Sequence, residues 1–287
     1  MNSPSQRKRY WSRSLVGYSP FANAKPNLGH YALATLEAKG YIGVDLKECD
    51  EFDHLGESCF GHNNTTGAKS SRRISVITQN VDSLHSTAGL KHCLHLHGRG
   101  DIVACQNCGF IRDRKEYHDE LSQYNQEWLS KATSHNTINE TNLRPDGDAE
   151  LKLGEVSHDE FILPPCSNCG DLAAVHNITA NDIRQQENQS FFKTAVVFFG
   201  DSVPRHRFDI SNTAIDTADG VLCIGTSLAV HSAFRLVKRS IERDVPVLIL
   251  NVGETRVERE GLGRDGLVTK VESPIGDTLN ELVNMME

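Results

Sequence analysis

Two cysteine pairs are the strongest chemical signal in the sequence. Cys105 and Cys108 are separated by two residues, as are Cys166 and Cys169, and a glycine directly follows each pair. Four thiolates with this spacing suit a tetrahedral Zn²⁺ ion, and a site with four sulfur ligands is structural because it leaves no position for a substrate. The segment between the pairs is longer than in the usual zinc ribbon, so four unrelated thiols and a redox-active Cys-x-x-Cys motif remain as alternatives.

Amide and carboxylate side chains gather in the segment TQNVDSLH (78–85). Gln79, Asn80 and Asp82 supply amide donors, amide acceptors and one carboxylate, which suit a ribose or a carboxamide. The segment also contains Val81 and directly follows an expected strand. Open α/β sheets bind their ligands at the carboxyl ends of strands, so this is a candidate ligand site. Taken alone, Asp82 would more often cap a helix.

Histidine supplies the candidate general base. His92, His95 and His97 lie close together in KHCLHLHGRGD. A neutral imidazole accepts a proton readily near pH 7, and the glycine after His97 would let a ligand approach closely. His97 is therefore the candidate base. A histidine zinc site is the competing interpretation, but the cysteine quartet already accounts for a metal.

Two further segments place small polar residues directly after expected strands. They are Gly225, Thr226 and Ser227 after one strand, and Asn251, Val252 and Gly253 after the next. Such residues at a helix N-terminus can hold a phosphate or a ribose, although Ser or Thr there is often only a cap. By contrast, residues 261–266 match GxGxxG without the strand–turn–helix context that the dinucleotide motif needs, so we expect a loop followed by a strand.

Buried strands alternating with helices must position these residues. Short continuous apolar runs, typical of parallel strands covered on both faces, occupy residues 74–79, 195–200, 220–225 and 246–251. Apolar residues recur at helical spacing in 27–40, 230–241 and 277–286. This alternation predicts an α/β fold with a doubly wound, Rossmann-like parallel sheet.

The segment 99–192 interrupts the alternation, because it is polar and carries both cysteine pairs. We expect residues 1–98 and 193–287 to form a discontinuous Rossmann-like domain that binds a nucleotide. Residues 99–192 are expected to form a small zinc-binding module. Residues 43–73 are polar and lack periodicity, so they are expected to be an inserted loop.

The composition argues against several classes of protein. The 287 residues include 30 Lys and Arg against 38 Asp and Glu, a formal net charge of −8, whereas a nucleic-acid binder normally has a basic surface. No apolar run approaches the length of a membrane span, and no apolar segment follows the basic opening residues, as a secretory signal would require. Of the four unpaired cysteines, Cys223 suits a small buried apolar position.

Taken together, these motifs resemble the sirtuin family of NAD-dependent protein deacylases. The matching segments are TQNVDSLH (78–85), HLHG (95–98), both cysteine pairs, VVFFGDSVP (196–204), GTSLAVHSA (225–233) and LNVGETR (250–256). The opening segment RYWSRSLVGYSPFANAKPNLGHYALATLE is most similar to the mitochondrial class II branch, like sirtuin-4. The resemblance implies NAD as co-substrate, one structural Zn²⁺ ion and acyl-lysine proteins as substrates. It also implies a mitochondrial location, with the cytoplasm and the nucleus as alternatives.

The resemblance also implies roles for individual residues. His97 would be the general base. Cofactor contacts would come from Gln79, Asn80, Val81 and Asp82 around the nicotinamide ribose, from Gly225, Thr226 and Ser227 around the phosphates, and from Asn251, Val252, Gly253 and Ile275 around the adenosine. The acyl-lysine would be bound by Phe199, Gly200 and Val230. Tyr10 and Arg13 match a pair that reads acidic acyl groups, although Arg13 is equally well explained as a solvated charge.

The implied reaction displaces nicotinamide by the acyl oxygen and leaves the acyl group on ADP-ribose, with mono-ADP-ribosyl transfer as a side reaction. Family members begin with a buried strand and a Gly-Ala-Gly-x-Ser loop, and neither occurs before Pro26. We therefore expect the first strand of the sheet to be missing, an unpaired edge on its neighbours, and weak NAD binding. The alternative function is accordingly a catalytically impaired sirtuin that binds acylated peptides or partners.

Overall fold

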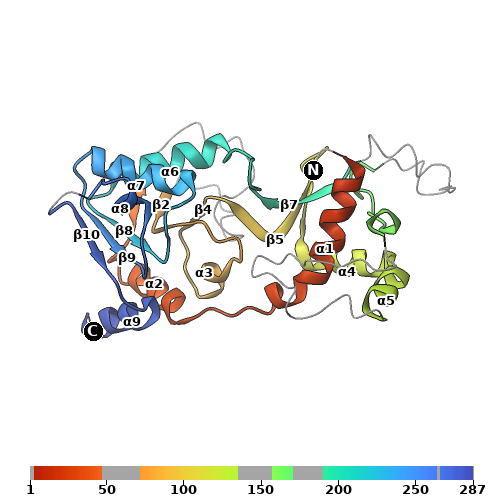
Figure 1. The fold of residues 1–287 in the computed structure, drawn as a ribbon, viewed down its shortest axis with the longest axis horizontal. Helices are drawn as coiled ribbons and strands as arrows, with labels where there is room; N and C mark the ends of the chain where they lie inside the picture. Colours follow the sequence, from red (N-terminus) through yellow and green to blue (C-terminus); the bar gives the residue numbers. More distant parts are fainter. Residues whose placement is uncertain (1–2, 47–71, 135–156, 171–189, 264–265, 287) are drawn as a thin grey trace. The chain divides into compact units, whose positions relative to one another are not determined.

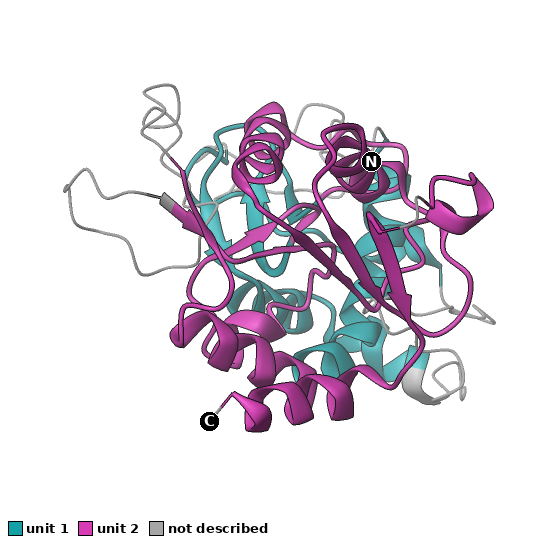
Figure 2. Ribbon diagram, turned by 90° about the vertical axis from the view of Figure 1, so that its left-hand side faces the viewer, with its two compact units in different colours: residues 1–24, 99–196 teal, residues 25–98, 197–287 magenta. Residues whose placement is uncertain are grey.

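The computed structural model describes residues 3–46, 72–134, 157–170, 190–263 and 266–286 (Figure 1). The chain divides into two compact units (Figure 2). Unit 1 comprises residues 1–24 and 99–196, and unit 2 comprises residues 25–98 and 197–287. Each unit has its own buried apolar core. No described helix is both long and apolar enough to cross a membrane.

Unit 1 combines helices with a three-stranded sheet. Its helices are α1 (Pro4–Ala22), α4 (Arg114–Tyr124), α5 (Gln126–Ser134) and the 3-10 turn at His158–Glu160. Its sheet has the order β6-β5-β7, made of β5 (Gly98–Cys105), β6 (Ile111–Asp113) and β7 (Phe192–Val196). Strands β5 and β6 are antiparallel, with Val103 opposite Arg112.

The N-terminal helix α1 supplies part of the core of unit 1. Trp11 is fully buried and packs edge-on against Tyr117, with ring centroids 4.8 Å apart. Its indole N–H donates to the carbonyl of Phe192 at 2.9 Å. This hydrogen bond gives a partner to the one polar atom of the buried Trp side chain. We expected residues 1–24 in the nucleotide-binding domain, but through this packing they belong with the cysteine-bearing segment.

The apolar run at 195–200 does not form the expected strand of the parallel sheet. Strand β7 ends at Val196 and lies in the sheet of unit 1, while residues 197–200 form a loop and turn. Phe199 is 98% exposed. The expectation was wrong because a short apolar run has no periodicity that separates a buried strand from a loop with apolar side chains.

Unit 2 contains two parallel sheets. The smaller pairs β3 (Val76–Thr78) with β4 (Cys93–His95), and the larger has the order β10-β9-β8, made of β8 (Val221–Ile224), β9 (Val247–Leu250) and β10 (Val268–Val271). The register places Thr78 opposite His95 and Leu222 opposite Leu248. The helices of unit 2 are α2 (Leu28–Ala38), α3 (Leu84–Thr87), α6 (Arg205–Thr217), α7 (His231–Glu242), α8 (Arg256–Arg259) and α9 (Ile275–Met285).

The larger sheet has helices on both of its faces. Alternate residues of a strand point to opposite faces. Ile249 of β9 shares a core cluster with Phe234 and other residues of α7. Leu250, on the opposite face, shares a cluster with Leu36 of α2 and Leu279 of α9. Two-sided coverage is what the continuous apolar runs of β8 and β9 predict.

Each parallel sheet has an edge without a strand partner. Among the described residues, β3 pairs only with β4, and β8 pairs only with β9 on one side. Side chains nonetheless connect the two sheets, because Val76 of β3 shares a core cluster with Leu222 and Ile224 of β8. Within the described residues, β3 and β8 therefore each have the unpaired edge that the sequence analysis expected.

The expected loop at 43–73 is paired at both of its ends. Strand β1 (Val44–Leu46) runs antiparallel to β2 (Arg72–Ile74), so these ends are strands rather than loop. The interior of that insertion, with Cys49 and Cys59, lies outside the described residues, as do 135–156 and 171–189. The GxGxxG segment at 261–266 is followed by β10, a strand as expected, and its residues 264–265 are also outside the described part.

Candidate active site and zinc centre

The candidate base His97 lies two residues after β4, partly buried in unit 2. Its Nε2 lies 2.7 Å from Oγ of Ser232, and its carbonyl accepts the N–H of Val197 at 2.8 Å. The pKa of His97 is lower than usual because burial disfavours the imidazolium. The backbone of Gln79 opposes this effect, and the charge of Arg207 adds to it. A lowered pKa keeps the ring neutral at pH 7, the state that accepts a proton.

Gln79 and Thr226 connect the segments that follow β3 and β8. The amide Nε2 of Gln79 donates to Oγ1 of Thr226 at 3.0 Å, and the backbone N–H of Leu228 donates to the same oxygen at 3.1 Å. Leu228 is buried with a φ of +56°, so the hydroxyl helps to hold a left-handed turn. The two polar segments that the sequence singled out, 79–82 and 225–227, therefore lie side by side.

The other polar residues after β3 have local roles. Oδ1 of Asp82 accepts the backbone N–H of Leu84, the first residue of the short helix α3, at 3.0 Å, but the N-cap position of that helix is Ser83 and not Asp82. The backbone N–H of Asn80 donates to Oγ1 of Thr78 at 3.1 Å, and its side chain is exposed. Val81 between them is partly buried.

Gly225 is closely approached by α9. It has a φ of +59°, and its N–H donates to the carbonyl of Leu250 at 3.0 Å. A Cβ added to Gly225 would lie 2.8 Å from Cδ1 of Ile275, so both the backbone and the contact favour glycine. Two expected cofactor residues, Gly225 and Ile275, therefore touch. Ser227 completes this turn, with its carbonyl accepting the N–H of Arg256 at 2.9 Å.

The residues after β9 form a tight turn. The amide of Asn251 donates to the carbonyls of Val252 and Gly253 at 2.9 and 3.2 Å. The N–H of Gly253 donates to Oε1 of Glu272 at 3.0 Å, and Nζ of Lys270 lies 3.1 Å from the same carboxylate oxygen. The side chain of Val252 is 69% exposed. Glu272 and Lys270 were missed by sequence reasoning, because no spacing connects them to this turn.

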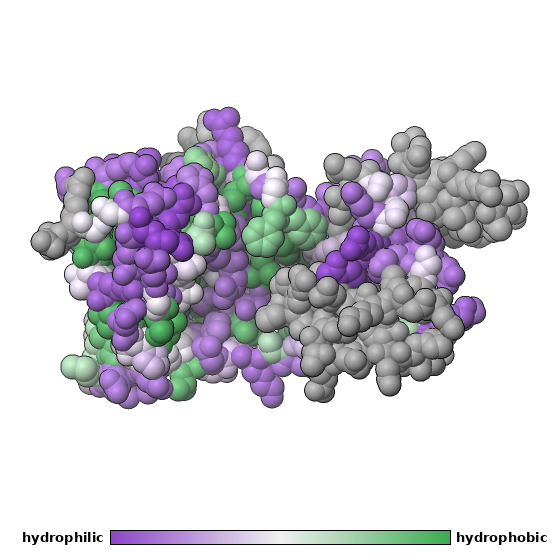
Figure 3. Space-filling view, in the orientation of Figure 1, coloured by the Kyte–Doolittle hydropathy of each residue, from purple (hydrophilic) through white to green (hydrophobic). Residues whose placement is uncertain are grey.

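The residues expected to contact the acyl-lysine are surface positions of unit 2. Phe199 is exposed, Val230 is 39% exposed directly before α7, and Gly200 has a φ of +92° with no atom within 4 Å of an added Cβ. Figure 3 shows apolar residues at the described surface among polar ones. Phe199 and Val230 are therefore accessible to a ligand.

Tyr10 and Arg13 belong to unit 1, whereas the other expected cofactor and substrate residues lie in unit 2. Both are on α1. Oη of Tyr10 lies 2.6 Å from Oγ1 of Thr194. Arg13 is close enough to His158 to lower the pKa of that histidine, after the larger effect of burial.

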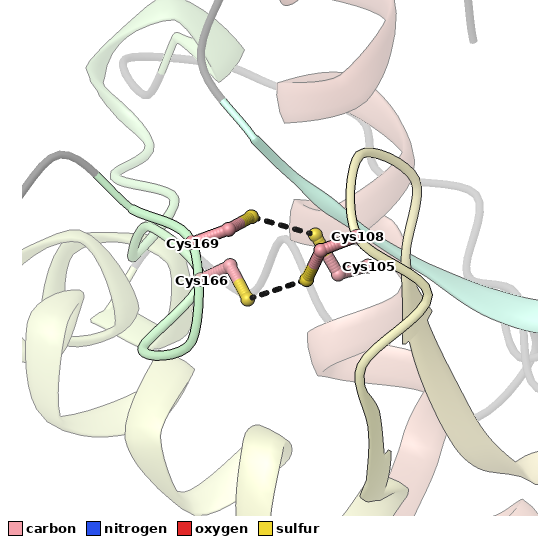
Figure 4. Close-up of side chains that lie close together, drawn as sticks. All are labelled: Cys105, Cys108, Cys166 and Cys169. Atoms are coloured by element: carbon pink, nitrogen blue, oxygen red, sulfur yellow. Dashed lines mark hydrogen bonds between the residues drawn. The ribbon is translucent and has the colours of Figure 1, made fainter.

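The four paired cysteines converge in unit 1 (Figure 4). The Sγ atoms of Cys105 and Cys169 are 3.6 Å apart, and those of Cys108 and Cys166 are 3.8 Å apart. Zn–S bonds of about 2.3 Å in a tetrahedron place sulfur atoms about 3.8 Å apart, so the quartet fits one zinc ion. Among the described side chains this is the one group suited to a metal. The proposed four-sulfur ligand set is therefore assembled by the fold.

Two asparagines donate hydrogen bonds to the cysteine sulfurs. Nδ2 of Asn107 lies 3.3 Å from Sγ of Cys169, and Nδ2 of Asn168 lies 3.4 Å from Sγ of Cys108. Each asparagine directly precedes the second cysteine of its own pair and reaches a sulfur of the opposite pair. The bond from Asn168 is the largest of several hydrogen bonds, including one from the backbone of Phe110, that together lower the pKa of Cys108 to about 6, which favours the thiolate that binds metal. The repeated Asn-Cys order is the signal in the sequence that could have revealed this support.

Comparisons with known proteins agree with these observations. The sequence model of the Sir2 family matches residues 62–232. The chain is 34% identical over 272 residues to NAD-dependent protein deacetylase 2 of Bradyrhizobium diazoefficiens, spanning 95% of this chain and 76% of that protein. It is 32% identical over 282 residues to NAD-dependent protein deacylase SIR4 of Monosiga brevicollis, spanning 97% of this chain and 71% of that protein.

A solved structure of Sir2 with p53 peptide and NAD⁺ has a similar fold. It superposes with a TM-score of 0.54 at 21% identity, over 93% of this chain and 73% of that one. At this identity the likeness concerns the fold alone. The family model covers more than half of the chain, and the two relatives exceed 30% identity over nearly its whole length. The chain therefore belongs to the Sir2 family, the sirtuins.

Proposed function

We propose that this chain is an NAD-dependent protein lysine deacylase, which transfers an acyl group from lysine to ADP-ribose and releases nicotinamide. The observation that supports this most directly is the neutral, anchored imidazole of His97 in the same unit as the polar turns after β3, β8 and β9. Its relatives in Bradyrhizobium and Monosiga are named as an NAD-dependent protein deacetylase and deacylase.

The turns after the three strands suit a dinucleotide. They combine the exposed amide of Asn80, the hydroxyls of Thr226 and Ser227, and glycines with positive φ at Gly225 and Gly253, which allow close approach. We assign the nicotinamide ribose to Gln79, Asn80, Val81 and Asp82, the phosphates to Gly225, Thr226 and Ser227, and the adenosine to Asn251, Val252, Gly253 and Ile275. When bound, NAD supplies the ribose carbon that receives the acyl oxygen.

His97 acts in this proposal as the general base that takes a proton from a ribose hydroxyl. Its low pKa and its placement both serve that role. The exposed residues Phe199, Gly200 and Val230 would receive the acyl-lysine. Tyr10 and Arg13 would read an acidic acyl group. The four cysteines would hold zinc for structure only, since four sulfurs leave no open coordination position.

Finer features of the proposal rest on the resemblance of the opening segment. We infer a class II sirtuin close to the sirtuin-4 branch, a mitochondrial location, and mono-ADP-ribosyl transfer as a second activity. We also infer that the two parallel sheets of unit 2 are parts of one doubly wound, Rossmann-like sheet. In the Rossmann strand order 3-2-1-4-5-6, strand 1 lies between strands 2 and 4. With β3 as strand 2 and β8 as strand 4, the two sheets would be the two sides of one sheet that strand 1 joins.

Nicotinamide release from NAD in the presence of an acetyl-lysine peptide tests the proposal. We expect turnover that requires both the peptide and NAD, and a loss of at least about 100-fold in His97→Tyr, which removes the base. His231→Tyr is the matched control, since His231 is an exposed histidine directly after Val230 and is expected to remain active. Peptide binding without nicotinamide release by the wild type would instead favour the alternative of an acyl-peptide-binding module. Full activity of His97→Tyr would refute the assignment of the base.

A further inference from the structure

We propose that Ser232 is a positioning residue for His97, whose hydroxyl holds the imidazole in the tautomer that presents Nε2 as the proton acceptor. This inference rests on the proposed role of His97 as the base. It concerns a residue that lies in the matching segment GTSLAVHSA (225–233) but has no role assigned from the sequence. Three features support it: a short contact, a rigid anchor for the serine, and the effect of the Gln79 backbone on the pKa of the ring.

The contact is short and comes from a well-anchored residue. Nε2 of His97 and Oγ of Ser232 are 2.7 Å apart, a normal hydrogen-bond length. Ser232 is the second residue of α7, and the helix is fixed by Phe234 and Val237 in the core of unit 2. The backbone of His97 is fixed in turn by the hydrogen bond that its carbonyl accepts from Val197.

The effect of the Gln79 backbone on the ring indicates the direction of the hydrogen bond. The backbone of Gln79 favours the protonated form of the His97 ring, as a carbonyl does when it accepts a ring N–H. Since Ser232 occupies Nε2, Nδ1 is the nitrogen left for that carbonyl. A neutral imidazole carries only one N–H. With the proton on Nδ1, Nε2 must accept, so the hydroxyl of Ser232 donates to it.

This arrangement prepares the ring for proton transfer. A general base must direct an unprotonated nitrogen at its substrate, and the serine keeps Nε2 unprotonated until a ribose hydroxyl replaces it. A hydrogen bond to the neutral form lowers the pKa of the group. Burial and the charge of Arg207 on α6 act on His97 in the same direction, and the backbone of Gln79 opposes them. Removing the Ser232 hydroxyl should therefore raise the pKa of the free protein.

Ser232→Ala and Ser232→Thr separate this role from a packing role. For Ser232→Ala we expect the acid limb of the pH profile of kcat/KM, which reports the free enzyme, to move upward by about half to one pH unit, as a hydrogen bond of ordinary strength implies. The plateau should fall about 3- to 10-fold, because the ring loses its hydrogen bond with Ser232. Ser232→Thr keeps the hydroxyl and should restore both.

Ser240→Ala is the matched control. Ser240 lies on the same helix, and its buried hydroxyl donates to the carbonyl of Leu236 at 3.1 Å. This variant should leave the acid limb in place. An acid limb that does not move in Ser232→Ala, or that moves equally in Ser240→Ala, would overturn the inference.

Imidazole ¹⁵N NMR makes the inference independent of turnover. In the wild type we expect the His97 resonances of the tautomer protonated at Nδ1, and in Ser232→Ala a mixture of tautomers with a higher pKa. If the chain lacked deacylase activity yet showed this change, the proposed function would fail while the role of Ser232 stood. If the chain were active and the tautomer unchanged in Ser232→Ala, the role of Ser232 would fail alone.

Discussion

Gly225→Ala tests how closely the turn after β8 approaches α9. The substitution places a Cβ in the left-handed region at a φ of +59°, 2.8 Å from Cδ1 of Ile275. The backbone conformation costs about 1–2 kcal/mol. Moving the Ile275 side chain out of its preferred rotamer costs about 0.5–1.5 kcal/mol more. We therefore expect the free energy of unfolding of unit 2 to fall by about 1.5–3.5 kcal/mol.

Two companion variants separate these contributions. Gly40 has a φ of +78° with no atom within 4 Å of an added Cβ, so Gly40→Ala should show the backbone cost alone. Ile275→Val removes the methyl group that Gly225→Ala would strike. The double variant should therefore be more stable than the sum of the single effects by about 0.5–1.5 kcal/mol, since the contact is gone while the backbone cost remains.

Urea unfolding of the four proteins of this cycle gives the coupling energy. The probe matters, because Trp11 and Trp128 are the two tryptophans of the chain and both lie in unit 1. Tryptophan fluorescence would report unit 1, so far-UV circular dichroism is needed to follow unit 2. Additive effects, with a coupling energy within about 0.3 kcal/mol of zero, would show that Cδ1 of Ile275 does not occupy the space beside Gly225.

Two further predictions concern the zinc centre and the pH dependence of stability. Asn107→Leu should speed zinc release to a coloured chelator by about 10-fold or more, as loss of a hydrogen bond to a metal ligand commonly does. Gln106→Leu, which changes the neighbouring residue without a bond to sulfur, should not, and equal rates would contradict the role of the amide. Glu37 accepts the backbone N–H groups of Lys91 and His92 at 2.7 and 2.9 Å, and these bonds lower its pKa although burial alone would raise it. Glu37→Gln should therefore cost about 1.5–3 kcal/mol at pH 7. The difference from wild type should shrink as the pH falls below the ordinary Glu pKa of about 4.5, because the carboxyl of the unfolded chain takes up a proton first, and it should vanish once the native carboxylate is protonated at a lower pH. A difference that stays constant from pH 7 to pH 3.5 would refute this account.

Local patterns were enough to predict several elements and the ligand set of the zinc site. The expected helix at 230–241 is observed as α7, and the expected strands at 220–225 and 246–251 are observed as β8 and β9. These features depend on periodicity over one element. The cysteine quartet was predicted for a related reason, since a two-residue spacing within each pair already brings two sulfurs to one side of a turn.

Membership in a sheet or a unit was not predictable in the same way. The run 195–200 is apolar, but β7 stops at Val196 and lies in the sheet of unit 1. The place of helix α1 in unit 1 was not predictable from local sequence either. It depends on the buried Trp11, whose partners Tyr117 and Phe192 are far away in the sequence. Burial of an apolar side chain is favourable, but the local sequence does not specify which partners bury it.

The amino-acid sequence by itself determined the chemical groups that this protein can offer: four cysteines suited to zinc, a candidate histidine base, and polar turns after parallel strands. Only the tertiary structure decided how those groups are prepared. The contact between His97 and Ser232 joins residues 135 positions apart, and the contact between Gln79 and Thr226 spans 147. Hydrogen bonds require their atoms within about 3 Å, and for residues so distant in sequence only the packing of whole strands and helices brings the atoms that close.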